Sequence, residues 1–428
     1  METTIETRQA ALIRRAEDLF PGGVNSPVRA FRSVGRPPLI LQAGAGPRVR
    51  DADGRWYLDY IGAWGPALLG HAHPDVVEAV RTAALEGFAL GATSPREIEL
   101  GEAIRAALPS MERLRFTSSG TEAAMSAIRL ARGATGRDLV LKFAGGYHGH
   151  SDGLLAEAGS GIATLAIPGS AGVPASIAGA TVVVPYNDLP AVRAAFERHS
   201  GRIAAIIVEP VAANVGVVPP GPGFLEGLRE VASGDGALLI FDEVITGFRV
   251  AHDGAQGRYG IRPDLTVLGK IIGGGLPVGA YGGRREIMDL IAPSGPVYQA
   301  GTLSGHPLTM AAGTATLGHL RPERYAELEA TGATLEAGLR DAAGAAGARV
   351  SIGRVGALLT VFFRPVAPRD YAEAGESDRA AFARFFGAML DAGVLLPPSQ
   401  FEAWFISLAH GPEVVAETIE AARAAFRA

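Results

Sequence analysis

Short apolar runs alternate with stretches of helical spacing along this 428-residue chain, and this alternation constrains the fold more than any other feature. Such a rhythm is typical of a largely parallel sheet that helices cover on both faces. Helical spacing is clearest at 122–132 and 189–199. The apolar runs predict strands at Arg113–Phe116, Leu139–Phe143, Thr181–Val184, Ile203–Val208, Ala237–Phe241 and Leu265–Leu268. The sequence therefore predicts an α/β fold.

The pattern changes after about residue 315, where Ala- and Glu-rich helical stretches surround a short strand pattern at 357–363. We therefore expect three parts: an N-terminal segment at 1–65, a large domain at 66–315 and a small C-terminal domain at 316–428. The stretch 151–179 is rich in Gly, Ala and Ser. Loops of that length in compact domains are typically functional lids or disordered segments, and a lid is the hypothesis that we follow.

Composition excludes several classes of function. The chain is 48% hydrophobic and 19% charged, with a net charge of −5, which is unlike a nucleic-acid binder. No apolar run is long enough to span a membrane and the N-terminus lacks a signal-peptide core, so we expect a soluble, cytoplasmic protein with no membrane partner. The absence of cysteine excludes thiolate chemistry. The pairs His71/His73 and His148/His150 have no third ligand nearby in sequence, so no metal site is predicted.

Lysine is almost absent from the chain. Lys142 and Lys270 are the two lysines, and the other 37 of the 39 basic residues are arginine. A lysine amine can lose its proton when it is buried and can then form an imine with a carbonyl compound, whereas a guanidinium cannot. Lys270 lies between an apolar run and a glycine cluster, and we interpret it as a reactive lysine. Lys142 lies inside an apolar run and is interpreted as structural.

Ligands of open α/β sheets bind beyond the carboxyl ends of the strands. At those ends the sequence has Lys270, the carboxylate of Asp242, the ring of Tyr147 and the run TSSGT at 117–121. That run precedes a predicted helix, whose free N–H groups favour a phosphate. Each feature alone is also typical of a helix cap or a surface charge. Together they favour pyridoxal phosphate, which needs an amine, a carboxylate at its ring nitrogen and a phosphate site.

Several longer strings resemble a known family, the glutamate-1-semialdehyde 2,1-aminomutases, within the class III aminotransferase group of fold type I pyridoxal-phosphate enzymes. These strings are GGVNSPVRAF (22–31), GGYHGH (145–150), FDEVITGFRV (241–250), GKIIGGGLPVGAYGGRR (269–285) and GPVYQAGTLSG (295–305). The resemblance implies a large domain with a mostly parallel sheet, and a smaller α/β domain formed by the C-terminal part with the N-terminal segment. It also implies a homodimer. The implied reaction converts glutamate 1-semialdehyde to 5-aminolevulinate, a tetrapyrrole precursor, by intramolecular amino transfer, with pyridoxal phosphate cycling to pyridoxamine phosphate.

The resemblance also implies roles for individual residues. Lys270 would bind the cofactor covalently and then move the proton. The other implied cofactor-binding residues are Ser119, Gly120, Thr121, Tyr147, Asp242, Val244 and, from the neighbouring subunit, Thr302. The implied substrate-binding residues are Ser26, Arg29, Trp64, Ser160, Asn214 and Glu402.

The chain departs from the family pattern at Ser118, Ala213, His306, Trp404 and the stretch 87–94. These departures leave open a second interpretation, a class III aminotransferase or racemase that acts on another amino acid. A third interpretation is a cofactor-binding protein without catalysis. The set of Lys270, Asp242 and Tyr147, together with the absence of a recognisable DNA-binding motif, argues against it.

Overall fold

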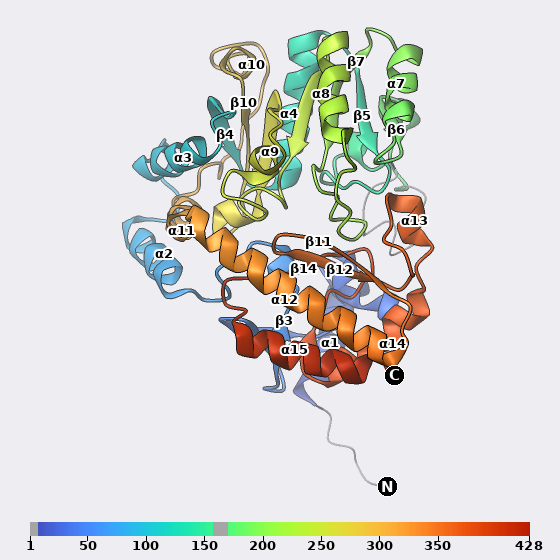
Figure 1. Cartoon of the computed structure of the whole chain (residues 1–428). Helices are drawn as coiled ribbons and strands as arrows, with labels where there is room; N and C mark the ends of the chain where they lie inside the picture. Colours follow the sequence, from blue (N-terminus) through green and yellow to red (C-terminus); the bar gives the residue numbers. More distant parts are fainter. Residues whose placement is uncertain (1–6, 157–169) are drawn as a thin grey trace.

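The structure is a computed structural model that describes residues 7–156 and 170–428. Within these residues the strands form three sheets, of seven, four and three strands. Figure 1 shows the large sheet and its helices in the upper half of the molecule, with the C-terminal helices below it. The order of the large sheet is β4 (Arg113–Thr117), β10 (Gly279–Gly283), β9 (Leu265–Gly269), β8 (Leu238–Asp242), β7 (Ile203–Val208), β5 (Leu139–Phe143) and β6 (Thr181–Val184).

All six predicted strands are present, each with bounds within one residue of those expected. The α/β prediction is therefore confirmed. The predicted helical stretches lie within α4 (Gly120–Thr135) and at α7 (Leu189–Arg198). Neighbouring strands pair in parallel, except that β10 runs antiparallel to both β4 and β9. The carboxyl ends of β4, β5, β7, β8 and β9 therefore meet at one edge of the sheet.

Helices cover both faces of this sheet. Along β7, Ala205 and Ile207 belong to the apolar core that contains α4, whereas Ile206 and Val208 pack in the core that contains α7 and α8 (Phe224–Asp235). Burial on both sides explains why the strand is a continuous apolar run rather than an alternating one.

Strand β10 was not predicted, because GAYGG has few of the bulky residues that mark a strand. Its glycines are needed for close packing. A Cβ at Gly279 would lie 2.0 Å from the Ser119 carbonyl oxygen, and one at Gly283 would lie 2.1 Å from the Asp264 carbonyl oxygen. Real Cβ atoms do not approach carbonyl oxygens so closely, so the neighbouring chain requires glycine here.

The N-terminal and C-terminal parts of the chain share a sheet. Strands β1 (Leu41–Ala45), β2 (Arg48–Asp51) and β3 (Trp56–Asp59) form an antiparallel sheet, and β3 pairs in parallel with β13 (Val394–Leu395). The third sheet consists of β11 (Ser351–Val355), β12 (Leu358–Phe362) and β14 (Trp404–Phe405). Strand β12 confirms the strand predicted at 357–363.

The remaining described α-helices are α1 (Arg8–Leu19), α2 (Pro74–Glu86), α3 (Pro95–Ala107), α6 (Ala175–Ala178), α9 (Gly254–Tyr259), α10 (Arg285–Met288), α11 (Pro307–His319), α12 (Pro322–Ala346), α13 (Tyr371–Gly375), α14 (Arg379–Asp391) and α15 (Pro412–Ala425). None of the helices in the described ranges combines the length and the apolar character needed to cross a bilayer. The predicted lid at 151–179 contains the short helix η5 (Asp152–Leu154) and α6. Residues 157–169, with Ser160, lie outside the described residues.

Candidate active site

A cavity of about 410 Å³ opens at the edge where the parallel strands end. Each of five strands supplies a lining residue at or just after its carboxyl end, as expected for an open α/β sheet. The residues that line the cavity are Ser118, Ser119, Gly120, Thr121, Tyr147, His148, Gly149, Glu209, Asn214, Asp242, Val244, Ile245, Lys270, Gly275, Leu276, Pro277 and Val278. The structure thus brings together eight of the predicted site residues: Ser119, Gly120, Thr121, Tyr147, Asn214, Asp242, Val244 and Lys270.

Lys270 follows β9 directly and begins the short helix η6 (Lys270–Gly273). Its backbone has φ 50°, a left-handed conformation that costs a residue with a side chain about 1 kcal/mol or more. The amine lies 5.7 Å from the centre of the Phe405 ring, and a Cβ at Gly65 would lie 3.0 Å from Lys270 Cδ. Burial lowers the pKa of the Lys270 amine from 10.5 to about 8. The amine is therefore much closer to losing its proton at neutral pH than an ordinary lysine is.

Charged residues act on the pKa of Lys270 in opposite directions: Glu402, Glu209 and Asp242 raise it, and Arg249 lowers it. The carboxylate of Glu402 favours the protonated amine, and the guanidinium of Arg249 disfavours it. Arg249 is buried under the Phe405 ring, with its Cζ 5.0 Å from the ring centre, and it donates hydrogen bonds to the carbonyl oxygens of Ile406, at 3.0 Å, and Gly65. Burial lowers the pKa of Arg249 to about 9. Sequence analysis missed Arg249, which is one arginine among 37.

Asp242 is the last residue of β8 and is buried. Its Oδ1 accepts a hydrogen bond from the Val244 backbone N–H at 3.0 Å, and its Oδ2 lies 2.8 Å from Nδ1 of the buried His148. The histidine holds the carboxylate in one orientation. His148 was considered only as half of a metal pair, and the sequence contains no signal that links it to Asp242, which is 94 residues away.

Glu209 is a second buried carboxylate in the cavity. It accepts hydrogen bonds from the backbone N–H groups of Tyr147 at 3.0 Å and Ala213 at 3.1 Å, and from the Asn214 amide at 2.9 Å. Burial raises its pKa above the usual range, and His148 opposes that shift. The sequence analysis missed Glu209, although it follows strand β7 just as Lys270 follows β9.

The N-terminus of α4 forms one wall of the cavity. Ser119 caps the helix by accepting a hydrogen bond from the Glu122 N–H at 3.2 Å. The N–H groups of the first turn have no partner within the helix and can bind an anion. A Cβ at Gly120 would lie 3.2 Å from Val244 Cγ2, and one at Gly149 would lie 2.6 Å from Thr121 Cα. The glycines therefore let these segments approach this turn closely.

The cavity lining does not include Ser26, Arg29, Trp64, Thr302 or Glu402. Trp64 is the last residue of η4 (Gly62–Trp64) and precedes Gly65, where a Cβ would lie 3.0 Å from Lys270 Cδ. The charge of Glu402 raises the pKa of Lys270. Ser26 and the exposed Arg29 lie at η2 (Pro27–Ala30). Thr302 lines a different hollow of about 420 Å³, together with residues 89–93 and 301–307.

The departures noted in the sequence lie in different places: Ser118 lines the Lys270 cavity, His306 lines the hollow that contains Thr302, and Ala213 donates its N–H to Glu209. Trp404 is buried, stacks on Phe385 at 6.4 Å between ring centres and packs against Tyr60 at 5.6 Å. It is therefore a core residue, next to the Phe405 that covers Lys270. Most of the stretch 87–94 lines the hollow that contains Thr302 and not the Lys270 cavity.

The family pattern of the class-III aminotransferases matches residues 31–415, which is most of the chain. The chain belongs to the class-III aminotransferases. Among curated members it is 58% identical to a glutamate-1-semialdehyde 2,1-aminomutase of Thermomicrobium roseum, over 96% of both chains. It is 56% identical to the enzyme of the same name from Sorangium cellulosum, over 98% of this chain and 96% of the relative.

Solved structures superpose over nearly the whole chain. An omega-transaminase from Sphaerobacter thermophilus has a TM-score of 0.91 at 32% identity and covers 99% of this chain and 98% of its own. A glutamate-1-semialdehyde-aminomutase from Pseudomonas aeruginosa, solved in complex with PMP, has a TM-score of 0.86 at 29% identity. The match covers 98% of this chain and 94% of that structure's chain. The fold is therefore that of fold type I enzymes, as the resemblance implied.

Proposed function

We propose that this protein converts glutamate 1-semialdehyde to 5-aminolevulinate by intramolecular amino transfer, the reaction of the glutamate-1-semialdehyde 2,1-aminomutases and a step of porphyrin biosynthesis. The observation that carries the proposal is the 56–58% identity to proteins of that name over nearly the full length of both chains. The second candidate is transamination of another amino acid, which the TM-score of 0.91 to an omega-transaminase favours. Backbone similarity at 32% identity reports the fold that the group shares, so the sequence identity decides for the mutase.

The cavity fits pyridoxal phosphate. The first turn of α4 has N–H groups for a phosphate, the buried Asp242 offers a carboxylate to a protonated ring nitrogen, and Lys270 offers an amine to an aldehyde. When bound, the cofactor supplies an electron sink and an amino group that can be exchanged with the substrate. Ser119, Gly120 and Thr121 would bind its phosphate, and Tyr147 and Val244 would contact its ring.

Lys270 would act as both the covalent anchor and the acid/base. An amine with a pKa of about 8 can both accept and return a proton near neutral pH, which the transfer between adjacent substrate carbons requires. Asp242 would keep its partner nitrogen protonated, and His148 would hold the Asp242 carboxylate in place through the 2.8 Å contact. Phe405 and Gly65 would exclude water from the side of Lys270 that they cover.

The residues that the resemblance implies for the substrate would bind it beside the cofactor. Arg29 suits its carboxylate, because a guanidinium binds carboxylate oxygens in a two-point geometry. Asn214, which is held by Glu209, would contact the substrate from the cavity wall. The other residues proposed for this role are Ser26, Trp64, Ser160 and Glu402.

We also propose that the active protein is a homodimer in which Thr302 of one copy completes the phosphate site of the other. Thr302 lies in a separate hollow of its own chain. Exposed large apolar side chains lie at this hollow: Leu90 and Leu303 line it, and Phe88 is close to Leu90 in sequence. Exposed apolar patches of this kind are typical of interaction surfaces. Mixing a Lys270→Arg variant with a Thr302→Val variant should restore activity if the two residues act across subunits.

The division into 1–65, 66–315 and 316–428 stays a proposal, supported by the large sheet that lies within 113–283 and by the pairing of β3 with β13. A cytoplasmic location likewise stays a proposal.

A donor-free assay tests the function. The purified protein, loaded with pyridoxamine phosphate, is incubated with glutamate 1-semialdehyde, and 5-aminolevulinate is followed by chromatography. Product in the absence of any amino donor supports the mutase, with the Lys270→Arg variant as the inactive control. A keto acid formed from an added amino donor, with no 5-aminolevulinate in the donor-free reaction, would instead support a transaminase.

A further inference from the structure

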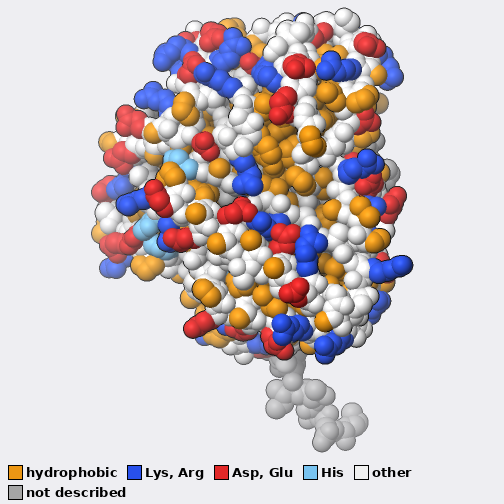
Figure 2. Space-filling model, in the orientation of Figure 1, with side chains coloured by type: hydrophobic (Ala, Val, Ile, Leu, Met, Phe, Trp, Pro, Cys, Tyr) orange, Lys and Arg blue, Asp and Glu red, His pale blue; other side chains and the backbone are white. Residues whose placement is uncertain are grey.

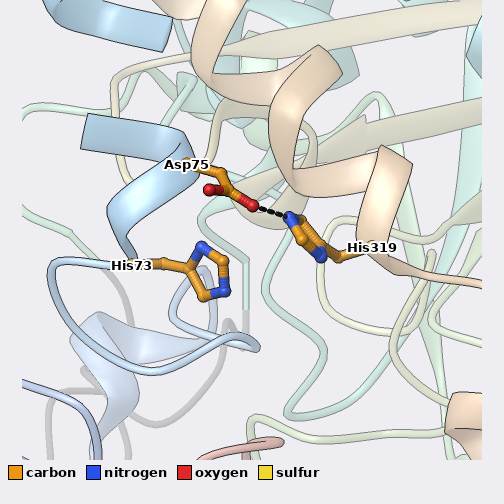
Figure 3. Close-up of side chains that lie close together, drawn as sticks. All are labelled: His73, Asp75 and His319. Carbon is orange, nitrogen blue, oxygen red and sulfur yellow. Dashed lines mark hydrogen bonds and ion pairs between the residues drawn. The ribbon is translucent and has the colours of Figure 1, made fainter. Parts of the chain in front are cut away.

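A group of metal-ligating side chains lies on the surface where α2 meets α11. His73 immediately precedes α2, Asp75 is in its first turn and His319 is the last residue of α11. Figure 3 shows the three side chains turned toward one another. Each offers one ligand atom, and these three atoms all lie within 4.8 Å of one another. His319 Nε2 is 2.8 Å from Asp75 Oδ2, and the two imidazole centres are 4.6 Å apart.

His73 is free to act as a ligand. Its Nδ1 is inaccessible to solvent and has no hydrogen-bond partner among the described residues, and its side chain does not cap α2. Its sequence neighbour His71 differs, because Nε2 of His71 is 2.6 Å from Asp59 Oδ2. An unpartnered buried nitrogen loses hydrogen-bond energy, and a bound cation would restore it.

The chemical type of the three ligand atoms indicates which class of metal ion would bind. Two imidazoles and one carboxylate are ligands of zinc and of similar divalent transition metals, whereas magnesium and calcium prefer all-oxygen sites. In a tetrahedral site with metal–nitrogen bonds of about 2.0 Å the donors are roughly 3.3 Å apart. The three ligand atoms lie at most 4.8 Å apart, so the pairs must close by no more than about 1.5 Å to reach that spacing.

The helices hold the ligands in place. Helices α2 and α11 pack against each other, which fixes Asp75 and His319 relative to one another. Asp75 and His319 are both partly open to solvent, so water can complete the coordination. Figure 2 shows histidine side chains reaching the surface on the side of the molecule where Figure 1 draws α2.

From these contacts we propose that His73, Asp75 and His319 bind one divalent transition-metal ion, of which zinc is the representative, and that the ion links the start of α2 to the end of α11. The site is separate from the Lys270 cavity, which none of the three residues lines. The prediction of no metal site considered only neighbours in sequence, and the third ligand lies more than 240 residues beyond the first two.

Calorimetric titration of the tag-free, cofactor-loaded protein with Zn²⁺ tests the proposal. We expect one equivalent per chain, and at least about tenfold weaker binding in each of His73→Gln, Asp75→Asn and His319→Gln, since each removes a ligand. His199→Gln is the matched control, because it changes a histidine at the end of α7, and its affinity should be unchanged. Zinc should also raise the melting temperature of the wild type but not of the three variants.

Bound Cu²⁺ reports its nitrogen ligands directly, so it distinguishes the loss of a ligand from a general loss of protein stability. Electron paramagnetic resonance of the protein with one equivalent of Cu²⁺ should show coupling to two imidazole nitrogens, and to one nitrogen in His73→Gln or His319→Gln. Wild-type zinc affinity in all three variants, or copper coupling that both histidine variants leave unchanged, would overturn the proposal.

Discussion

The lowered pKa of the Lys270 amine can be tested by direct measurement of how its reactivity depends on pH. With a pKa of about 8, roughly one amine in eleven is neutral at pH 7, whereas with the ordinary value of 10.5 the fraction is about three in ten thousand. The site thus increases the reactive form about 300-fold. Replacing Glu402 by Gln removes the carboxylate that most favours the protonated amine, so the pKa of Lys270 should fall below 8. Each unit of decrease multiplies the ratio of neutral to charged amine by ten.

The near absence of lysine makes the measurement simple. The cofactor-free protein is acetylated briefly at a series of pH values, and the modification of the peptide that contains Lys270 is quantified by mass spectrometry. Lys142 is the internal reference for a protected lysine in the acetylation measurement. Its amine is buried and donates hydrogen bonds to the carbonyl oxygens of Leu154, at 3.1 Å, and Ala156, at 2.7 Å. The exposed Glu413→Gln is the control for loss of one negative charge, and it should leave the Lys270 profile unchanged.

Arg249→Met should shift the same profile in the opposite direction. Its guanidinium disfavours the protonated amine, so its removal should raise the pKa of Lys270 toward 10.5 and reduce acetylation at pH 7. A wild-type midpoint near 10.5, or equal midpoints in the wild type and Glu402→Gln, would refute the electrostatic account of the site.

Three further outcomes follow from the site and the core. Lys270→Arg should abolish turnover while the circular dichroism spectrum and melting temperature stay near those of the wild type, because the charge is kept and the reactive amine is lost. Asp242→Asn should retain bound cofactor and lose at least about 100-fold in kcat, measured in the donor-free assay, and normal turnover would exclude the proposed role. Trp404→Ala should lower the free energy of unfolding by about 3–5 kcal/mol in a urea titration, because it removes a buried indole stacked on Phe385, and a loss below about 1 kcal/mol would show that the core does not depend on it.

The parallel strands and the residues at their carboxyl ends could be predicted from the sequence. Strands that are buried on both faces are mainly apolar, so most of their bounds could be inferred from the apolar runs, although β5 contains the buried Lys142 and β4 contains Arg113 and Arg115. Since parallel strands end at one edge, the sequence predicts that Asp242 and Lys270 lie close together. This reasoning is local, and it needs no knowledge of how distant segments pack.

Contacts between residues that are far apart in the sequence depend on how the whole chain packs. Strand β10 lacks a run of apolar residues because neighbouring backbone atoms approach it so closely that glycine is required. His148 contacts Asp242 across 94 residues, and His319 contacts Asp75 across 244. The pKa of Lys270 depends on burial and on charges from separate segments, such as Arg249 and Glu402. Such effects act through space rather than along the chain, and the periodicity of a sequence records burial but not the identity of the neighbour.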